Sequence, residues 1–281
     1  MKTIYPEYYS KFKCIASRCP DSCCIGWQIC LDEKTAQRYL TSDSLSISAV
    51  AKQCMRGSKN SRYLSLVKGR CPYLDENNLC NVIKEKGEDF LCEVCYNHPR
   101  FDNEIDGVMI KYLSLSCPEA SRLFCEECGA KRIKFLGDDS LIDSVVSVEE
   151  IDSSLKKLLA SDRIDTLFST MYEQMEYLDE STKEILTHIK AFAIVKKLEE
   201  LRCAKPFFAI SLFDYFCSVN CWNVDCRKTA LVNVVGVLAM MVVYDDVKSI
   251  YAYVKEIEHS EKNEKILRRK VASPLFKELF N

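Results

Sequence analysis

The chain has 281 residues, enough to bury a substantial hydrophobic core without covalent cross-links. Its formal charge of -2 at pH 7 gives no indication of the basic surface that nucleic-acid binding requires, so we expect no nucleic-acid partner. A hydrophobic share of 48%, with only 8 glycines and 7 prolines, indicates a folded globular protein and excludes a disordered one.

Cysteine is the residue type that distinguishes the first half of the chain. Thirteen of the 17 cysteines precede Gly129, and they come in tight groups. A disulfide scaffold is typical of short secreted chains with an even number of cysteines, whereas this count is odd and no signal-peptide run opens the sequence. We therefore expect a cytoplasmic protein whose grouped thiolates bind zinc or an iron–sulfur cluster.

The first half is predicted to mix short helices with strands. A short helix is expected at 32–40, and 41–61 is rich in serine without a clear pattern. Cys71 and Cys80 flank a polar turn at 75–78, which places both thiols at the base of one loop. Residues 101–105 and 108–115 around Asp106 and Gly107 predict a β-hairpin. Pro118 then begins a helix, with Cys117 at its N-terminal end, where the helix dipole favours a thiolate.

From about residue 151 the pattern is helical. Apolar residues recur at helical spacing in three groups, which predict three amphipathic helices: Ile151, Leu155, Leu158 and Leu159; Ile185, Ile189, Phe192 and Val195; and Val247, Ile250, Val254 and Ile257. The apolar segment 231–243 is shorter than the roughly 20 residues of a membrane span, so we expect a buried core helix and no membrane span.

These patterns predict a mostly α protein of two parts. The first part, 1–137, is a small α+β cysteine-rich metal-binding domain, and the second, 148–281, is a helical domain. The polar stretch between 137 and 148 is the expected boundary.

The cysteine spacings leave the kind of metal site open. The radical S-adenosylmethionine pattern C-x3-C-x2-C fails at Gly26, and no G-x-G loop marks a nucleotide site. Two C-x2-C pairs match a zinc ribbon at unusually long separation, namely Cys92 with Cys95 and Cys125 with Cys128. His98 is a candidate site residue, whereas the later group of Cys217, Cys221 and Cys226 is interpreted as core.

A series of ordered blocks resembles the flagellin lysine-N-methylase family. The blocks cover roughly residues 5–125, and the first and third also resemble a wider group of bacterial cysteine-cluster proteins. They comprise Tyr9, Phe12, Cys14, Cys19, Cys23, Cys24, Trp27 and Asp32; Cys71, Pro72, Tyr73, Leu74, Leu79 and Cys80; Cys95, Pro99 and Arg100; and Leu113, Ser114, Leu115, Ser116, Cys117, Pro118, Glu119 and Ala120.

The resemblance implies a cytoplasmic methyltransferase that transfers methyl groups from S-adenosylmethionine to lysine side chains of flagellin. It also implies an iron–sulfur cluster, expected to be 4Fe–4S, with zinc as the alternative. The metal ligands that the resemblance implies are Cys14, Cys19, Cys23, Cys24, Cys71, Cys80, Cys95 and Cys117.

Two interpretations remain open on the residues alone. One is the protein-lysine N-methyltransferase, and the other is a metal-stabilised cysteine-cluster binding module without methyltransferase activity. Glu88, Glu119 and the N-terminal tyrosines are candidates for a general base by residue type only. No catalytic residue and no S-adenosylmethionine site is assigned.

Overall fold

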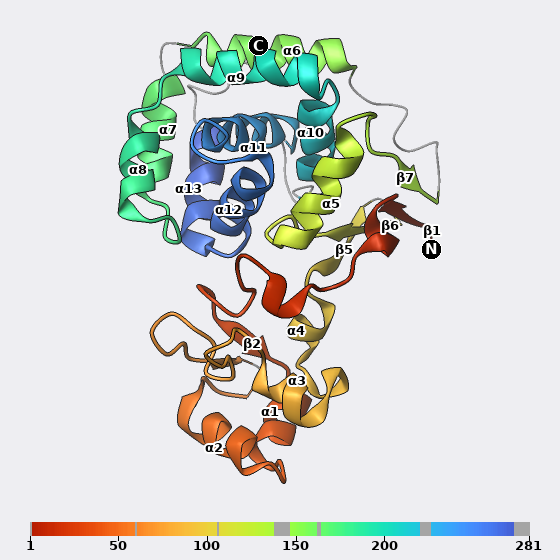
Figure 1. Cartoon of the computed structure of the whole chain (residues 1–281), viewed down its shortest axis with the longest axis vertical. Helices are drawn as coiled ribbons and strands as arrows, with labels where there is room; N and C mark the ends of the chain where they lie inside the picture. The colour runs from red at the N-terminus through yellow and green to blue at the C-terminus, as the bar shows by residue number, and fades with distance from the viewer. Residues whose placement is uncertain are drawn as a thin grey trace. The chain divides into compact units, whose positions relative to one another are not determined.

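The chain forms two compact units in the computed structural model, which describes residues 2–59, 61–105, 107–137, 147–161, 164–219 and 226–272. The helical unit comprises Met1–Phe12 and Phe101–Asn281, and the cysteine unit is Lys13–Arg100 (Figure 1). This division does not coincide with the expected one into 1–137 and 148–281, because the first strand pairs with segments near residue 110 and near residue 136. Most of the expected boundary, 138–146, lies outside the described residues.

A small sheet in the helical unit contains the N-terminal strand. Its strand order is β5-β6-β1-β7, and β1 runs parallel to β6 and antiparallel to β7. The close approach of the chain beside β7 requires Gly137, because a Cβ there would lie 2.2 Å from the Thr3 carbonyl oxygen. The predicted hairpin is confirmed as β5 and β6. The strand bounds are β1 (Lys2–Pro6), β5 (Arg100–Ile105), β6 (Val108–Leu113) and β7 (Phe135–Leu136).

Helices form most of the helical unit, which confirms the expectation of a mostly α protein with a small β component. The helix at the centre is α11, which packs against α6, α9, α10, α12 and α13. The bounds are α5 (Pro118–Cys128), α6 (Val148–Leu159), α7 (Ile164–Glu173), α8 (Glu180–Thr187), α9 (Ala191–Ala204), α10 (Phe208–Val219), α11 (Cys226–Met240), α12 (Asp246–Glu258) and α13 (Glu261–Val271); a 3₁₀ turn, η1, spans Tyr9–Lys11.

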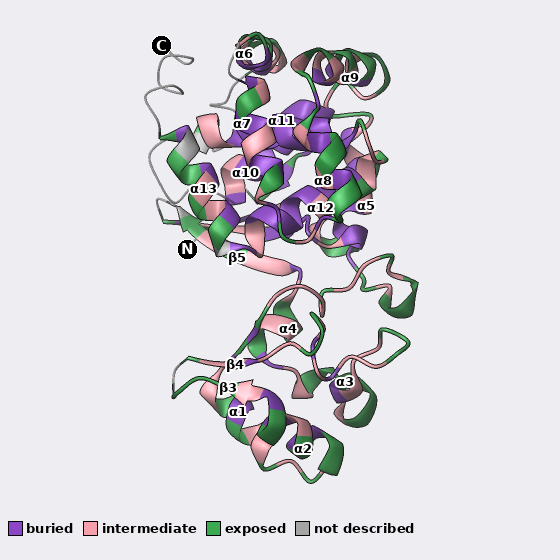
Figure 2. Ribbon diagram, turned by 90° about the vertical axis from the view of Figure 1, so that its left-hand side faces the viewer, coloured by how far each residue is buried: buried purple, intermediate pink, exposed green. Residues whose placement is uncertain are grey.

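The core of the helical unit is built around α11, as the apolar segment 231–243 predicted. Val235 and Leu238 are fully buried, and the buried colour of α11 contrasts with the exposed faces of α9 and α13 in Figure 2. In the part of the chain that the structure describes, no helix is long and apolar enough to cross a membrane.

Two of the three predicted amphipathic helices are confirmed. The first is α6, which begins with a capping box in which Ser147 and Glu150 satisfy each other's backbone N–H groups. Its four predicted apolar positions are all buried. The third is α12, where Ile250, Val254 and Ile257 are buried.

The second predicted helix is wrong, because the chain turns between α8 and α9. His188 lies in the C-cap of α8 and α9 begins at Ala191, so the residues on either side do not share one face. Ile185 is 53% exposed and Phe192 is 75% exposed. Of the four predicted positions, Ile189 is buried. The other buried positions are Leu186 on α8 and Ile194, Leu198 and Leu201 on α9, and one helical period does not describe both helices.

The cysteine unit has its own small core and an antiparallel sheet of order β2-β4-β3. The predicted helix at 32–40 is confirmed as α1, capped by Asp32, whose side chain accepts a hydrogen bond from Thr35 N–H. The next helix, α2, lies in the serine-rich segment that showed no pattern. The bounds are η2 (Ala16–Arg18), β2 (Ile29–Leu31), α1 (Glu33–Leu40), α2 (Leu45–Cys54), β3 (Met55–Arg56), β4 (Arg62–Leu64), α3 (Asn81–Lys86), η3 (Glu88–Phe90) and α4 (Glu93–Asn97).

Candidate metal centre

The segment that carries Cys24 lies against the segment that carries Cys71. The backbone N–H of Cys71 donates to the carbonyl of Cys24 at 2.7 Å, and that of Gly26 donates to Gly69 at 2.9 Å. Gly26 and Gly69 have φ of 93° and 76°, a conformation that residues with side chains rarely adopt. The two glycines supply the positive-φ backbone beside the Ile25–Arg70 bridge, and across this bridge the Cys24 and Cys71 sulfurs are in hydrogen-bond contact.

Cys71 and Cys80 flank one loop, as the turn at 75–78 predicted. An antiparallel bridge joins Leu74 and Cys80, and the N–H of Asn81 donates to the Tyr73 carbonyl at 2.8 Å. The Asp75 carboxylate closes the loop by accepting hydrogen bonds from the backbone N–H groups at 77 and 79, both at 2.8 Å. Cys80 then occupies the N-cap of α3.

Cys92 and Cys95 form a second pair of sulfurs in hydrogen-bond contact. Cys92 is the N-cap of α4 and Cys95 lies in its first turn, so a spacing of three residues brings both side chains to one face. Cys92 is only 1% exposed. It was not among the predicted ligands, although its C-x2-C spacing from Cys95 is the sequence signal that identifies it.

Within each pair one sulfur is favoured as the thiolate. The hydrogen bond from Cys24 lowers the pKa of Cys71, and the hydrogen bond from Cys95 lowers the pKa of Cys92. The hydrogen bond with Cys23 lowers the pKa of Cys24. The hydrogen bond with Cys71 and burial both raise it, and their larger combined effect brings it to about 12. Burial also raises the pKa of Cys80. In each pair, the cysteine with the lowered pKa loses its proton more readily than its partner.

The first three predicted cysteines lie nearer the surface. Cys14 and Cys23 are exposed, and Cys19 is half-buried. Burial raises the pKa of Cys19. The indole N–H of Trp27 donates to the Cys23 carbonyl at 2.6 Å and fixes the turn that carries Cys23 and Cys24. The Trp27 ring also lies 6.3 Å from the ring of His98, which precedes a cis peptide bond to Pro99.

Seven of the eight predicted ligands therefore belong to the cysteine unit, and Cys117 belongs to the helical unit. Cys117 is the N-cap of α5 and Pro118 is the first helical residue, as predicted. The half-buried Cys117 side chain packs against the core of the helical unit.

The zinc-ribbon pattern pairs cysteines from different units. Cys125 and Cys128 are buried on α5, and burial raises the pKa of Cys125 to about 12 and that of Cys128 as well. Cys217 packs against the same core, as expected, whereas Cys221 lies outside the described residues, as does the side chain of Cys226.

The donor chemistry of the cysteine unit fits an iron–sulfur cluster. Among the described residues, no three His, Cys, Asp or Glu side chains are arranged to hold one metal ion. Thiolates are soft donors, and they hold either zinc or an iron–sulfur cluster. The cysteine unit offers such donors from three segments: Cys71 and Cys92 are buried, and Cys24, Cys80 and Cys95 are half-buried against the same core.

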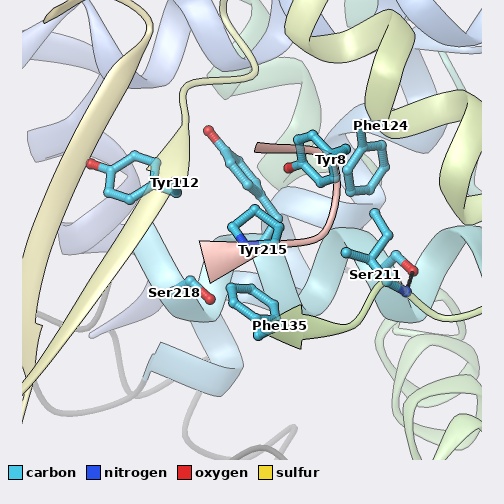
Figure 3. Close-up of a pocket in the computed structure, with 9 residues that line it drawn as sticks. Tyr8, Tyr112, Phe124, Phe135, Ser211, Tyr215 and Ser218 are labelled. Carbon is cyan, nitrogen blue, oxygen red and sulfur yellow. Dashed lines mark hydrogen bonds between the residues drawn. The ribbon is translucent and has the colours of Figure 1, made fainter. Parts of the chain in front are cut away.

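The helical unit contains a small internal space lined by aromatic and serine side chains (Figure 3). Tyr8, Tyr112, Phe124 and Tyr215 form much of its wall. Its volume is about 10 Å³, room for about one water molecule. A cofactor such as S-adenosylmethionine needs a pocket of several hundred Å³, so this space is not its binding site.

Comparison with curated proteins identifies relatives in the genus Salmonella. The flagellar biosynthetic protein FliU of Salmonella muenchen is 36% identical over 122 residues, which cover 41% of this chain and 72% of that protein. The lysine-N-methylase of Salmonella typhimurium strain LT2 is 31% identical over 160 residues, 55% of this chain and 39% of that enzyme. The chain belongs to the flagellin lysine-N-methylase family.

The relationship to this family covers part of each protein. The lysine-N-methylase of Salmonella choleraesuis also matches at 31% identity over 160 residues, so the chain spans about two fifths of the length of these lysine-N-methylases. No family model matches the chain, and no solved structure matches it.

Proposed function

We propose that this flagellin lysine-N-methylase family member transfers methyl groups from S-adenosylmethionine to lysine ε-amines of flagellin in the cytoplasm. The observation that carries the proposal is the 31% identity over 160 residues to proteins named lysine-N-methylase. The FliU relative adds a flagellar context. The aligned region covers 39% of the length of the Salmonella typhimurium enzyme.

We further propose that the cysteine unit holds an iron–sulfur cluster. The residues that would hold it are the cysteines in or against the core of the cysteine unit, Cys24, Cys71, Cys80 and Cys95, with Cys92 beside them, while Cys14, Cys19 and Cys23 form an outer group. When bound, the cluster would join three segments of a unit whose own core is small. Transfer of a methyl cation to an amine requires no net electron transfer, so this structural role is compatible with the chemistry.

A binding module without catalytic activity is the second candidate function. It is favoured by one observation, the separate core and sheet of the cysteine unit, which can form without any catalytic group. In that case a metal, zinc or iron, would stabilise a surface for a protein partner.

Anaerobic purification followed by metal analysis and a methylation assay separates the two candidates. The methyltransferase is expected to contain iron and sulfide, to bind S-adenosylmethionine, and to add mass increments of one or more methyl groups to flagellin lysines. Stoichiometric zinc without iron would contradict the cluster. Fully metallated protein that leaves flagellin unmodified would contradict methyl transfer and favour the binding module.

A further inference from the structure

A side chain of α1 holds the backbone that leads into Cys92. The Arg38 guanidinium donates to the carbonyl oxygens of three consecutive residues, 89, 90 and 91, at 3.1, 3.0 and 2.9 Å. Cys92 follows immediately as the N-cap of α4. Arg38 lies outside the sequence blocks that resemble the family.

The three carbonyl groups depend on the cation for this arrangement. Their oxygens carry like partial charges and repel one another when they turn toward one point. A guanidinium stabilises them together because it is always charged and presents five N–H donors in a planar fork. The direction in which the chain enters Cys92 therefore depends on Arg38.

α1 contacts the backbone on both sides of Cys92. Asp32, Thr35 and Arg38 follow one another at a spacing of three, which places them on one side of the helix. One Asp32 oxygen caps α1 by accepting from the Thr35 N–H at 2.7 Å, and the other accepts from the Glu93 N–H at 3.4 Å. Carbonyls before Cys92 and an N–H after it are thus bound by the same helix.

Aromatic contacts add to these hydrogen bonds at Phe90. The guanidinium carbon of Arg38 lies 4.6 Å from the centre of the Phe90 ring. The Tyr39 ring is stacked with the Phe90 ring, with centres 5.7 Å apart, and meets the Tyr73 ring edge-on at 5.4 Å. Tyr73 follows Cys71 by two residues, so α1 contacts the loop of Cys71 as well.

The orientation of α4 decides where two of the thiols point. Cys92 caps this helix and Cys95 lies in it, so both sulfurs move with it. The helix has only 5 residues, too few to be stable without outside contacts. The segments of Cys24 and Cys71 are joined by a backbone hydrogen bond, whereas side chains of α1 bind the segment that leads into α4.

We propose that Arg38 is a positioning residue that sets the orientation in which the Cys92–Cys95 pair would bind metal. The role rests on the proposed metal centre. Arg38 is not a ligand, because a guanidinium donates hydrogen bonds and has no lone pair to offer a metal. It acts through the carbonyls of residues 89–91. Lysine cannot take its place, because an ammonium is a compact point charge without the planar fork.

The test uses the whole chain with its metal as isolated under anaerobic conditions. Loss of metal to excess EDTA is followed over time, and X-ray absorption at the edge of the bound metal counts its sulfur ligands. Arg38→Lys is expected to lose metal roughly 10–100-fold faster than the parent, in line with the affinity lost when groups that orient metal ligands are removed. Its remaining metal is expected to have fewer sulfur ligands.

Arg56→Lys is the matched control for the change of charge geometry. Arg56 also donates to backbone carbonyls, at 2.7 and 2.9 Å, but to those of the neighbouring residues 53 and 55. This variant is expected to keep the parental rate of metal loss and the parental sulfur count.

The outcomes separate the role of Arg38 from the metal centre on which it rests. A parent isolated without metal contradicts the metal centre and this role with it. A metal-containing parent beside an Arg38→Lys variant with the same loss rate and sulfur count contradicts this role alone. Faster loss at an unchanged sulfur count would show a purely structural contribution and would also overturn it.

Asp32→Ser replaces Arg38→Lys if the latter does not fold. Serine keeps the cap of α1 with its single oxygen and removes the acceptor for the Glu93 N–H. The expected change is in the same direction and smaller, because one long hydrogen bond is lost instead of three shorter ones. Parental metal loss and sulfur count in this variant would overturn the positioning of the pair by α1.

Discussion

The ring of Tyr253 on α12 lies directly over Gly236 of α11, so a Cβ at position 236 would come within 2.3 Å of two ring carbons. The Tyr253 hydroxyl donates to the Asn233 side chain at 2.9 Å, and Tyr172 donates to the Gly236 carbonyl at 3.0 Å. Hydrogen bonds therefore hold the ring in place on the helix, and the glycine is required for the close packing of the two helices.

Gly236→Ala is expected to destabilise the helical unit by about 1–3 kcal/mol. Overpacking against Tyr253 outweighs the gain in helix propensity of up to about 1 kcal/mol that alanine brings. Urea unfolding followed by circular dichroism measures the difference. Gly129→Ala is the control, because a Cβ there meets only ordinary contacts at 3.6 Å or more. Equal destabilisation of both variants would contradict the packing argument.

A charge inside α11 should lower the free energy of unfolding far more than a charge just beyond the C-terminal end of this helix. Val235→Asp or Leu238→Asp places an unpaired carboxylate at a site with 0% exposure, and a loss of more than about 4 kcal/mol is expected. Val242→Asp, at a position that is 42% exposed, should change the free energy of unfolding by less than about 1 kcal/mol. Thermal melting of the three variants tests the ranking. If Val235→Asp melted like the parent, the buried assignment of α11 would be wrong.

Removing one partner of the Arg132–Asp214 ion pair should destabilise the protein more than removing both. Burial raises the pKa of Asp214 even though Arg132 favours its ionised form, so the carboxylate depends on its partner. Arg132→Met leaves that carboxylate uncompensated and is expected to cost about 3–5 kcal/mol. Arg132→Met combined with Asp214→Leu should recover much of the loss. A double variant no more stable than Arg132→Met would contradict this account.

Stability should fall as pH rises toward neutrality because of Glu258. Folding raises its pKa from the usual 4.5 to about 7, so the folded state binds the proton more tightly than the unfolded state. The resulting stabilisation is complete below about pH 4.5 and is lost as pH rises through about 7, with a magnitude on the order of 1–3 kcal/mol. Urea titrations between pH 4.5 and 8 should show a flatter dependence for Glu258→Gln than for the parent. Parallel curves would count against the raised pKa.

Cys92 is expected to belong to the metal centre although no family block contains it. Its sulfur contacts that of Cys95, and the side chain is buried beside the other thiols. Cys92→Ser should lower the iron and sulfide content of anaerobically purified protein several-fold, because serine does not replace a soft thiolate ligand. Cys30→Ser, at an exposed cysteine of the same unit, should retain the parental metal content. Loss in both variants would indicate general unfolding rather than loss of a ligand.

Local sequence signals predicted the elements whose causes are local. The periods of α6 and α12, the hairpin around Gly107 and the helix start at Pro118 all depend on neighbouring residues, and each is present. The turn between α8 and α9 was missed because two short helices happened to place apolar residues at one continuous spacing. Leu186 and Ile194, rather than Ile185 and Phe192, face the core because tertiary packing decides which face is buried.

Long-range pairing explains the rest of what the sequence did not predict. The pairing of Lys2 with Val108 joins residues more than a hundred positions apart, so no local hydrophobic periodicity predicts it. The contact between Ser114 and Glu258 is of the same kind, since it joins a motif to a residue that no motif contains. Among the predicted ligands, the grouping of Cys71 with Cys80 was visible because one turn connects them, whereas the approach of Cys24 to Cys71 depends on a bridge between distant segments.

The cysteine unit is an insertion, because the chain leaves the helical unit after Phe12 and re-enters it at Phe101. During synthesis, the whole of Lys13–Arg100 emerges from the ribosome before most of the helical unit exists. The strand Lys2–Pro6, flanked on both sides in its sheet, must wait for partners near residues 110 and 136. Because domains generally fold as units in the order of their synthesis, the cysteine unit can fold, and bind the proposed metal, before the helical unit is complete.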